Sequence, residues 1–176
     1  ASGTARITAK ALGSSLTGTI TKAYDGNTDA ILTSSNFDLT GFISGEGASV
    51  TKTAGTYNDK DVADANSASV TLASNDFSAD SGTTLTNYIL PTIASGTASI
   101  TKKALTISGT TTNDKVYDGN TNADVNLGTL SGFVTGETLS TTAVGTFASK
   151  DVGNRTATFV YTLVDGTNGE LANNYS

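Results

Sequence analysis

Short stretches in which polar and hydrophobic residues alternate recur along the chain. Two examples are residues 68–72, Ala-Ser-Val-Thr-Leu, and residues 158–163, Thr-Phe-Val-Tyr-Thr-Leu. Successive side chains of a β-strand point to opposite faces, so a period of two is typical of strands with one buried face. The chain has no sustained series of hydrophobic residues three and four apart, the pattern of an amphipathic helix. The pattern therefore predicts an all-β fold of short strands.

Two Asp-Gly pairs mark the clearest turns. Residues 24–26 and residues 117–119 both read Tyr-Asp-Gly, and each follows a predicted strand. Glycine adopts the positive φ angles of tight turns, so Asp-Gly between strands favours a hairpin. We expect each tyrosine to pack at the base of a hairpin and each aspartate to form the turn. The motif residues are Tyr24, Asp25, Gly26, Tyr117, Asp118 and Gly119.

The chain contains nearly the same sequence twice. Residues 1–12 and 94–105 match at ten of twelve positions, at a spacing of 93. The motif Lys-x-Tyr-Asp-Gly-Asn-Thr-x-Ala recurs at the same spacing, from Lys22 and from Lys115. This period indicates two domains in tandem, residues 1–100 and 101–176. Residues 88–107 have strand composition with few breaks, so we expect two β-sandwich domains that stand end to end as an elongated rod.

The second copy is shorter than the first. It stops just after Asn174-Tyr175, the counterpart of Asn87-Tyr88, so we expect it to lack the strand that residues 89–100 form in the first copy. Residues 1–7 repeat the end of that strand, and we interpret them as the tail of a preceding repeat. Because an unpaired sheet edge tends to accept another strand, the edge of the second copy is expected to accept residues 1–7 of another molecule.

Further motifs match between the copies. Gly-Phe-x-x-Gly-Glu begins at Gly41 and at Gly132, and Lys-Asp-Val begins at Lys60 and at Lys150. With Tyr-Asp-Gly and the late Asn-Tyr, these motifs resemble the YDG domain, which occurs in tandem in large bacterial surface adhesins of the filamentous-haemagglutinin type. The resemblance implies an extracellular stalk module at the bacterial cell surface, which carries a distal adhesive region and has neighbouring repeats as its partners. It implies no catalytic residues.

Composition and charge exclude several kinds of chemistry. The 176 residues include no His and no Cys, which excludes Ser-His-Asp and Cys-His catalysis, disulfides and the usual zinc sites. The net charge of −6 argues against nucleic acid as a partner. No hydrophobic run approaches the ~18 residues of a membrane-spanning helix, so we expect no direct membrane insertion. We expect neither enzymatic activity nor a cofactor.

The tyrosine turns also allow a different function. An exposed tyrosine beside carboxylate and amide groups can stack on a sugar ring and hydrogen-bond to its hydroxyl groups. A carbohydrate-binding module that holds a glycan or polysaccharide at Tyr24 and Tyr117 is therefore the alternative to a stalk.

The second copy has oxygen-bearing side chains at alternate positions after Tyr117, as calcium loops do. The first copy has Asp25, Asn27 and Asp29 in the same region, without the distal glutamate of an EF-hand. We expect solvated turns here, with weak affinity for any calcium. The candidate calcium ligands are Asp118, Asn120, Asn122 and Asp124.

Each copy also contains the residue types of a Lys-Asn isopeptide crosslink in a suitable order. Lysine and asparagine are common on solvated strand faces, so we expect no crosslink. The residues concerned are Lys10, Glu46 and Asn87 in the first copy and Lys103, Glu137 and Asn174 in the second.

Overall fold

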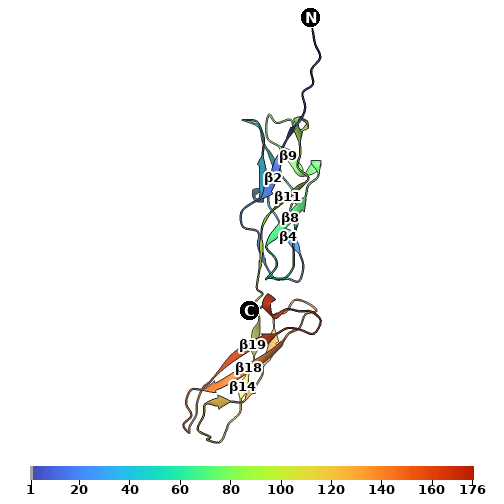
Figure 1. The fold of residues 1–176 in the computed structure, drawn as a ribbon. Helices are drawn as coiled ribbons and strands as arrows, with labels where there is room; N and C mark the ends of the chain where they lie inside the picture. Colours follow the sequence, from blue (N-terminus) through green and yellow to red (C-terminus); the bar gives the residue numbers. More distant parts are fainter. Residues whose placement is uncertain (1) are drawn as a thin grey trace. The chain divides into compact units, whose positions relative to one another are not determined.

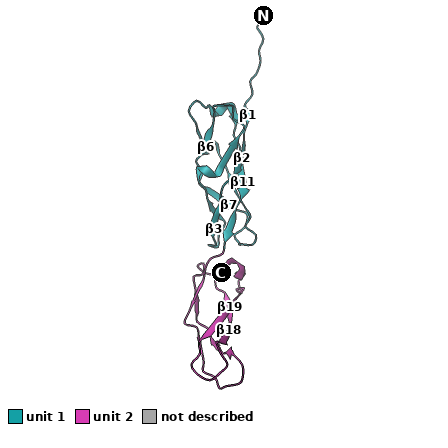
Figure 2. Cartoon of the chain, turned by 90° about the vertical axis from the view of Figure 1, so that its left-hand side faces the viewer, with its two compact units in different colours: residues 1–101 teal, residues 102–176 magenta. Residues whose placement is uncertain are grey.

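The computed structural model describes residues 2–176 and consists of short β-strands, loops and four three-residue 3-10 helices (Figure 1). Ala1, the first residue of the predicted tail 1–7, lies outside the described residues. No α-helix occurs in this range, so the all-β prediction is confirmed. No helix here is long or apolar enough to cross a membrane. The chain divides into two compact units, residues 1–101 and residues 102–176 (Figure 2).

Unit 1 consists of short strands and three 3-10 helices. Its strands are β1 (Lys10–Ala11), β2 (Gly13–Leu16), β3 (Thr21–Ala23), β4 (Asp29–Ile31), β5 (Phe37–Thr40), β6 (Ala48–Val50), β7 (Ala54–Tyr57), β8 (Ser67–Thr71), β9 (Phe77–Ala79), β10 (Tyr88–Ile89), β11 (Ile93–Thr97) and β12 (Ser99–Thr101). Its 3-10 helices are η1 (Ser34–Asn36), η2 (Ser74–Asp76) and η3 (Leu85–Asn87).

The largest sheet of unit 1 has four antiparallel strands in the order β11-β8-β7-β4. Two further antiparallel pairs are β2 with β5 and β6 with β9. Two pairs are parallel: β1 lies beside β10, and β3 lies beside β12. Each parallel pair joins segments that are far apart in the sequence.

The hydrophobic core is concentrated in unit 1. Leu32, Val50 and Tyr24 are each only 1% exposed. Among the described residues, every buried hydrophobic side chain except Tyr175 belongs to this unit. The alternation predicted at residues 68–72 is observed, because Ala68, Val70 and Leu72 are buried while the residues between them are exposed.

Strands β11 and β12 close this core. Ala94 on β11 is 1% exposed and Ile100 on β12 is 3% exposed. β11 pairs with β8 and also touches β2, where the Ser14 hydroxyl donates to the Ile93 carbonyl at 2.6 Å. The approach is so close that a Cβ on Gly96 would collide with the backbone of Leu16. Burial of a side chain such as that of Ile100 contributes about 1.5–3 kcal/mol.

Unit 2 has a smaller set of strands and one 3-10 helix. They are β13 (Thr106–Ser108), β14 (Thr111–Thr112), β15 (Asn122–Ala123), β16 (Val125–Asn126), β17 (Thr129–Ser131), β18 (Ser140–Phe147), β19 (Ala157–Val164) and η4 (Ala172–Asn174). β13 pairs with β17, β14 pairs with β16, and β15-β18-β19 form a three-stranded sheet.

Strand β19 is the edge of its sheet. Its counterpart in unit 1, β8, lies between β7 and β11, but the described part of unit 2 contains no strand equivalent to β11 or β12. As a result Tyr161 on β19 is 36% exposed, whereas its counterpart on the β8 side, Leu72, is 4% exposed. Unit 2 therefore has an open edge where unit 1 has two closing strands.

The residues before β1 extend away from the strands of unit 1 (Figure 1). Residues 2–9 are exposed and belong to no strand. Ile7 is 99% exposed, whereas its counterpart Ile100 is 3% exposed.

Candidate functional site: the Tyr-Asp-Gly turns

The Tyr-Asp-Gly turn of unit 1 folds around the ammonium group of Lys22, which stands on β3. Lys22 Nζ lies 2.6 Å from Asp25 Oδ1 and donates to Asn27 Oδ1 at 2.7 Å and to the Asn27 carbonyl at 2.9 Å. It also lies 5.5 Å from the centre of the Tyr57 ring. A lysine thus supplies the positive charge around which the oxygens of the turn gather.

The side chains of the turn also accept hydrogen bonds from its backbone amides. The Asn27 amide donates to Asp25 Oδ1 at 3.2 Å, and the Asp29 amide donates to Asn27 Oδ1 at 2.8 Å. Gly26 has a φ of 81°, a conformation that favours glycine. The motif spacing therefore follows from successive Asx-type turns around one lysine.

Unit 2 repeats the same contacts. Lys115 Nζ lies 2.9 Å from Asp118 Oδ1 and donates to Asn120 Oδ1 at 2.8 Å and to the Asn120 carbonyl at 2.9 Å. It lies 5.8 Å from the centre of the Phe147 ring. The repeated motif includes this lysine, but its role in the turn is not predicted from the sequence. Its fixed spacing from Asp and Asn was the available signal.

The prediction of hairpins at these turns is wrong. Strand β3 before the first turn pairs with β12, and β4 after it pairs with β7, so the turn joins strands that are not each other's neighbours. In unit 2 the residues just before Tyr117 form no strand, and β15 pairs with β18. The reason is that Lys22 and Lys115 stabilise the turns through bonds to the Asp and Asn side chains. The flanking strands then pair with strands distant in the sequence.

The two tyrosines of the motif have opposite environments. Tyr24 is 1% exposed and lies beneath Lys60, whose Nζ is 5.8 Å from the ring centre. Tyr117 is 56% exposed. The expected packing of the tyrosine at the base of the turn therefore holds for Tyr24 and is wrong for Tyr117. The backbone explains the difference, because the Tyr24 amide donates to the Thr101 carbonyl of β12 at 2.8 Å, and unit 2 as described has no such strand.

A second repeated arrangement joins Gly-Phe-x-x-Gly-Glu to the late Asn-Tyr. The Tyr88 hydroxyl donates to Glu46 Oε2 at 2.5 Å, and its ring packs edge-on against Phe42. In unit 2 the Tyr175 hydroxyl donates to Glu137 Oε2 at 2.6 Å and its ring packs against Phe133. The contact between these two motifs is not predicted from the sequence, although both motifs are repeated.

The residues of the candidate crosslink are placed differently in the two units. In unit 1 Lys10 and Asn87 are exposed, and Glu46 accepts the hydrogen bond from Tyr88. In unit 2 Asn174 is 1% exposed, and its carbonyl accepts the Lys103 amide at 2.9 Å. The absence of a crosslink stays a prediction.

The candidate calcium ligands of unit 2 already have partners. Asp118 Oδ1 accepts from Lys115 Nζ, and Asn120 Oδ1 accepts from the same ammonium and from the Asn122 amide at 2.9 Å. Asp124 is exposed, and its carbonyl accepts the Thr112 hydroxyl. In residues 2–176 no group of three or more acidic side chains is placed to hold a metal ion. A calcium ion would have to displace Lys115.

The lysines also set the charge state of the turns. The hydrogen bond from Lys115 is the main reason why the pKa of the Asp118 carboxyl lies below its ordinary value, and the Asn120 amide adds to the effect. Burial opposes ionisation of Asp25, but its bonds with Lys22 and Asn27 outweigh burial and lower its pKa as well. Both carboxylates are therefore stabilised in their charged form.

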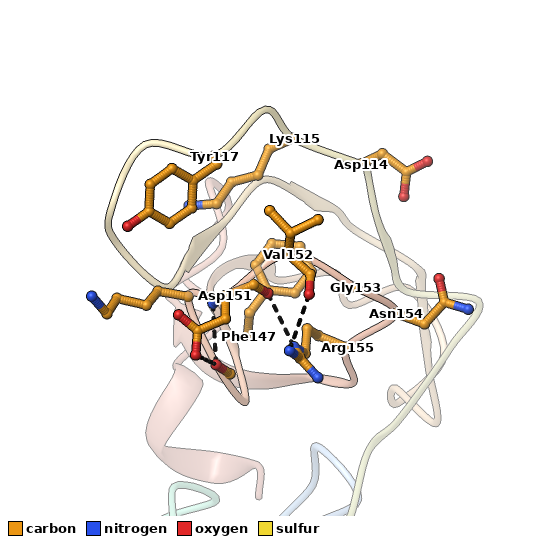
Figure 3. A pocket seen from close by; sticks show the side chains of 11 residues that line it. Asp114, Lys115, Tyr117, Phe147, Asp151, Val152, Gly153, Asn154 and Arg155 are labelled. Atoms are coloured by element: carbon orange, nitrogen blue, oxygen red, sulfur yellow. Dashed lines mark hydrogen bonds between the residues drawn. The ribbon is translucent and has the colours of Figure 1, made fainter.

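A cavity of about 550 Å³ separates the Tyr117 loop from the turn at residues 149–155 (Figure 3). Tyr117 and Lys115 lie on one side of it, and Val152 and Arg155 lie on the other. The Arg155 side chain donates to the carbonyls of Asp151 at 3.1 Å and Val152 at 3.2 Å. In unit 1 the equivalent tyrosine, Tyr24, is buried in its own domain.

We predict that Asp118→Asn makes stability less sensitive to acid. An unfolded Asp has a pKa of about 3.9 and the folded value of Asp118 is lower, so the carboxylate adds stability above about pH 4 and loses it as the pH falls through the folded value. The difference in unfolding free energy between the wild type and Asp118→Asn should therefore shrink as the pH is lowered.

Urea unfolding followed by circular dichroism between roughly pH 6 and pH 2.5 measures this difference across the titration. Asp38→Asn, which changes an exposed aspartate on β5, is the matched control. A difference for Asp118→Asn that stays constant over this range would contradict the prediction.

Comparison with known proteins agrees with the repeated motifs. The model of the YDG domain matches residues 8–97 and again residues 101–176, so the predicted resemblance is confirmed for both copies. No curated protein and no solved structure matches the chain. The matched ranges contain both lysine-centred turns and both Tyr-Glu pairs, and the chain therefore belongs to the YDG domain family, with two copies of the domain in tandem.

Proposed function

We propose that this chain is part of the stalk of a secreted or surface-exposed bacterial adhesin. Its two units act as β-sandwich domains that stand end to end and hold a distal adhesive region away from the cell, with neighbouring repeats as their partners. Two tandem YDG domains made of β-strands support this role. The role requires no catalysis and no cofactor, because a stalk acts through its length and stiffness.

The observation that carries the proposal is the shortness of the connection between the units. β12 ends at Thr101, and Lys103 already forms a parallel bridge with Tyr175 inside unit 2. One residue, Lys102, therefore separates the last ladder of unit 1 from the first pairing of unit 2. A connection of this length has few conformations, whereas a flexible linker of many residues would allow the domains to reorient.

The repeated polar residues support a structural role as well. Lys22 and Lys115 hold turns together, and Glu46 and Glu137 accept hydrogen bonds from buried tyrosines. These polar groups have their hydrogen-bond partners within their own domain. Motifs that recur because they fix the fold suit a module that is copied to build length.

We predict that the chain scatters X-rays in solution as an elongated particle with a narrow range of interdomain angles. The experiment uses a concentration series, so that scattering from single chains is obtained by extrapolation. A variant with about ten Gly and Ser residues inserted after Lys102 is the control, because such a linker behaves as a flexible coil.

The insertion should broaden the distribution of distances between atoms within one particle, while each unit stays folded. A compact wild-type particle, or a distribution as broad as that of the insertion variant, would contradict the stalk proposal.

The second candidate function is carbohydrate binding, and the exposure of Tyr117 favours it for unit 2. Tyr117 is 56% exposed beside a cavity that is also lined by Asp114, Asp151 and Asn154. Tyr24 is 1% exposed and cannot stack on a sugar. This alternative therefore requires one sugar site in unit 2 rather than one in each copy.

If unit 2 binds a saccharide, a glycan array should show binding that Tyr117→Ala abolishes. Tyr161→Ala is the matched control, because Tyr161 is partly exposed on β19 and lies outside the Tyr117 cavity. Absence of binding by the wild type, or equal loss in both variants, would reject a sugar site at Tyr117.

A further inference from the structure

Two segments of unit 1 that are distant in the sequence lie side by side along the unit. We call residues 10–24, which contain β1, β2 and β3, the entry segment, and residues 88–101, which contain β10, β11 and β12, the exit segment. β1 pairs with β10, β2 touches β11, and β3 pairs with β12. In Figure 2 β1 lies at one end of unit 1 and β3 at the other. The contact between the two segments therefore extends over the length of the unit.

The entry and exit segments run in the same direction. Lys10 lies opposite Tyr88 in the parallel ladder of β1 and β10. Thr21 lies opposite Ser99 in the parallel ladder of β3 and β12. The offset between partners is 78 positions in both ladders, so the register is the same at both ends of the contact.

Hydrogen bonds next to these ladders also join the two segments. At the β1 end the Leu12 amide donates to the Ile89 carbonyl at 3.1 Å. At the β3 end the Tyr24 amide donates to the Thr101 carbonyl at 2.8 Å. Backbone bonds between the segments are therefore present at both ends of unit 1.

The contact between the segments is closely packed and partly buried. Leu16 and Ile20 of the entry segment are buried, as are Ala94 and Ile100 of the exit segment. A Cβ on Gly96 would collide with the backbone of Leu16, so the two backbones are in direct contact at β2 and β11. Hydrogen bonds that are shielded from water are electrostatically stronger than exposed ones.

The direction of the segments decides how a pull on the chain would load these bonds. The chain enters the folded part of unit 1 at β1 and leaves it at β12. Because the two segments are parallel, these points lie at opposite ends of their contact. Tension then acts along the strands and loads all the bonds between them together. In an antiparallel contact both points would lie at the same end, and the bonds would break one after another.

We propose that the entry and exit segments form a mechanical clamp, a contact that keeps unit 1 folded while the chain is under tension. Forced unfolding is governed by the unfolding rate, so a contact that must break all at once prolongs the life of the folded domain. The inference deepens the stalk proposal and rests on it for the source of the tension. The start of unit 2 repeats the first contact of the clamp, because Lys103 forms a parallel bridge with Tyr175 as Lys10 pairs with Tyr88.

The repeated motifs of the domain hold the two ends of the clamp. At the β1 end the Tyr88 hydroxyl donates to Glu46, which stands on the loop between β5 and β6. At the β3 end Lys22 is bonded to Asp25 and Asn27 of the following turn. The motifs therefore connect both ends of the clamp to other parts of unit 1.

Single-molecule pulling in two directions tests the clamp. The chain contains no cysteine, so a pair of introduced cysteines fixes where the two handles are attached. Ala9→Cys with Lys102→Cys pulls the clamp along its strands, because both residues are exposed and directly flank β1 and β12. Ala23→Cys with Lys102→Cys pulls β3 and β12 apart from one shared end, because Ala23 lies opposite Thr101.

The two directions should give different lifetimes at the same constant force. With handles at positions 9 and 102, unit 1 should stay folded roughly tenfold longer or more than with handles at positions 23 and 102, because several hydrogen bonds must break together. Unfolding is recognised by the gain in length of the chain between the handles, up to about 3.3–3.6 Å per residue.

A side-chain change tests the contact at β2 and β11. Ser14→Ala removes the bond of 2.6 Å from the Ser14 hydroxyl to the Ile93 carbonyl, which joins the two segments. It should shorten the lifetime about twofold to tenfold when the handles are at positions 9 and 102.

Thr83→Val is the matched control for Ser14→Ala. It removes a half-buried hydroxyl that accepts the Gly47 amide at 2.9 Å, outside both segments. Both variants should lower the stability to urea by similar amounts, but Thr83→Val should leave the lifetime under tension nearly unchanged.

Two results would overturn the clamp. The first is an equal lifetime in the two pulling directions. The second is an equal effect of Ser14→Ala and Thr83→Val on the lifetime under tension. Neither result contradicts the stalk proposal, which X-ray scattering tests separately, and a compact particle in solution would contradict the stalk without affecting the clamp.

Discussion

The core of unit 1 depends on one further strand that covers a sheet edge with a hydrophobic face. In unit 1 this strand is the continuous segment of β11 and β12, which pairs with β8, touches β2 and then turns parallel to β3. It places Ala94 and Ile100 in the core and holds Tyr24 there through the Thr101 carbonyl. Unit 2 has the same motifs without this segment among its described residues, and Tyr117 and Tyr161 are exposed where their counterparts Tyr24 and Leu72 are buried. One segment therefore accounts for most of the difference between the two copies.

The lysine-centred turns do not depend on that segment. Lys22 and Lys115 make the same set of contacts with Asp and Asn although only unit 1 has the closing strand. The turn is thus a local structure, stabilised by charge and by side-chain bonds to its own backbone. The ammonium group of each lysine lies where the oxygens of its turn converge.

The sequence alone predicts the strand content, the period of the repeat and the family, because alternation and motif spacing are local signals. It does not predict the pairing partners. β3 pairs with β12, whose residues follow about 78 positions later, and nothing in the composition of Thr21–Ala23 specifies that partner. The hairpin expectation at Asp25-Gly26 failed for this reason. The role of Lys22 was missed because a lysine on a strand usually faces solvent, and the exposure of Tyr117 depends on a strand elsewhere in the chain.

The central claim is that β12 buries the Tyr-Asp-Gly region in unit 1 and that this region is open in unit 2. Amide hydrogen exchange followed by mass spectrometry tests it most directly, on the wild-type chain at low concentration. The account predicts slow exchange in residues 21–24 and fast exchange in residues 114–117, while both turns that follow behave alike. Equal protection of the two segments would contradict it.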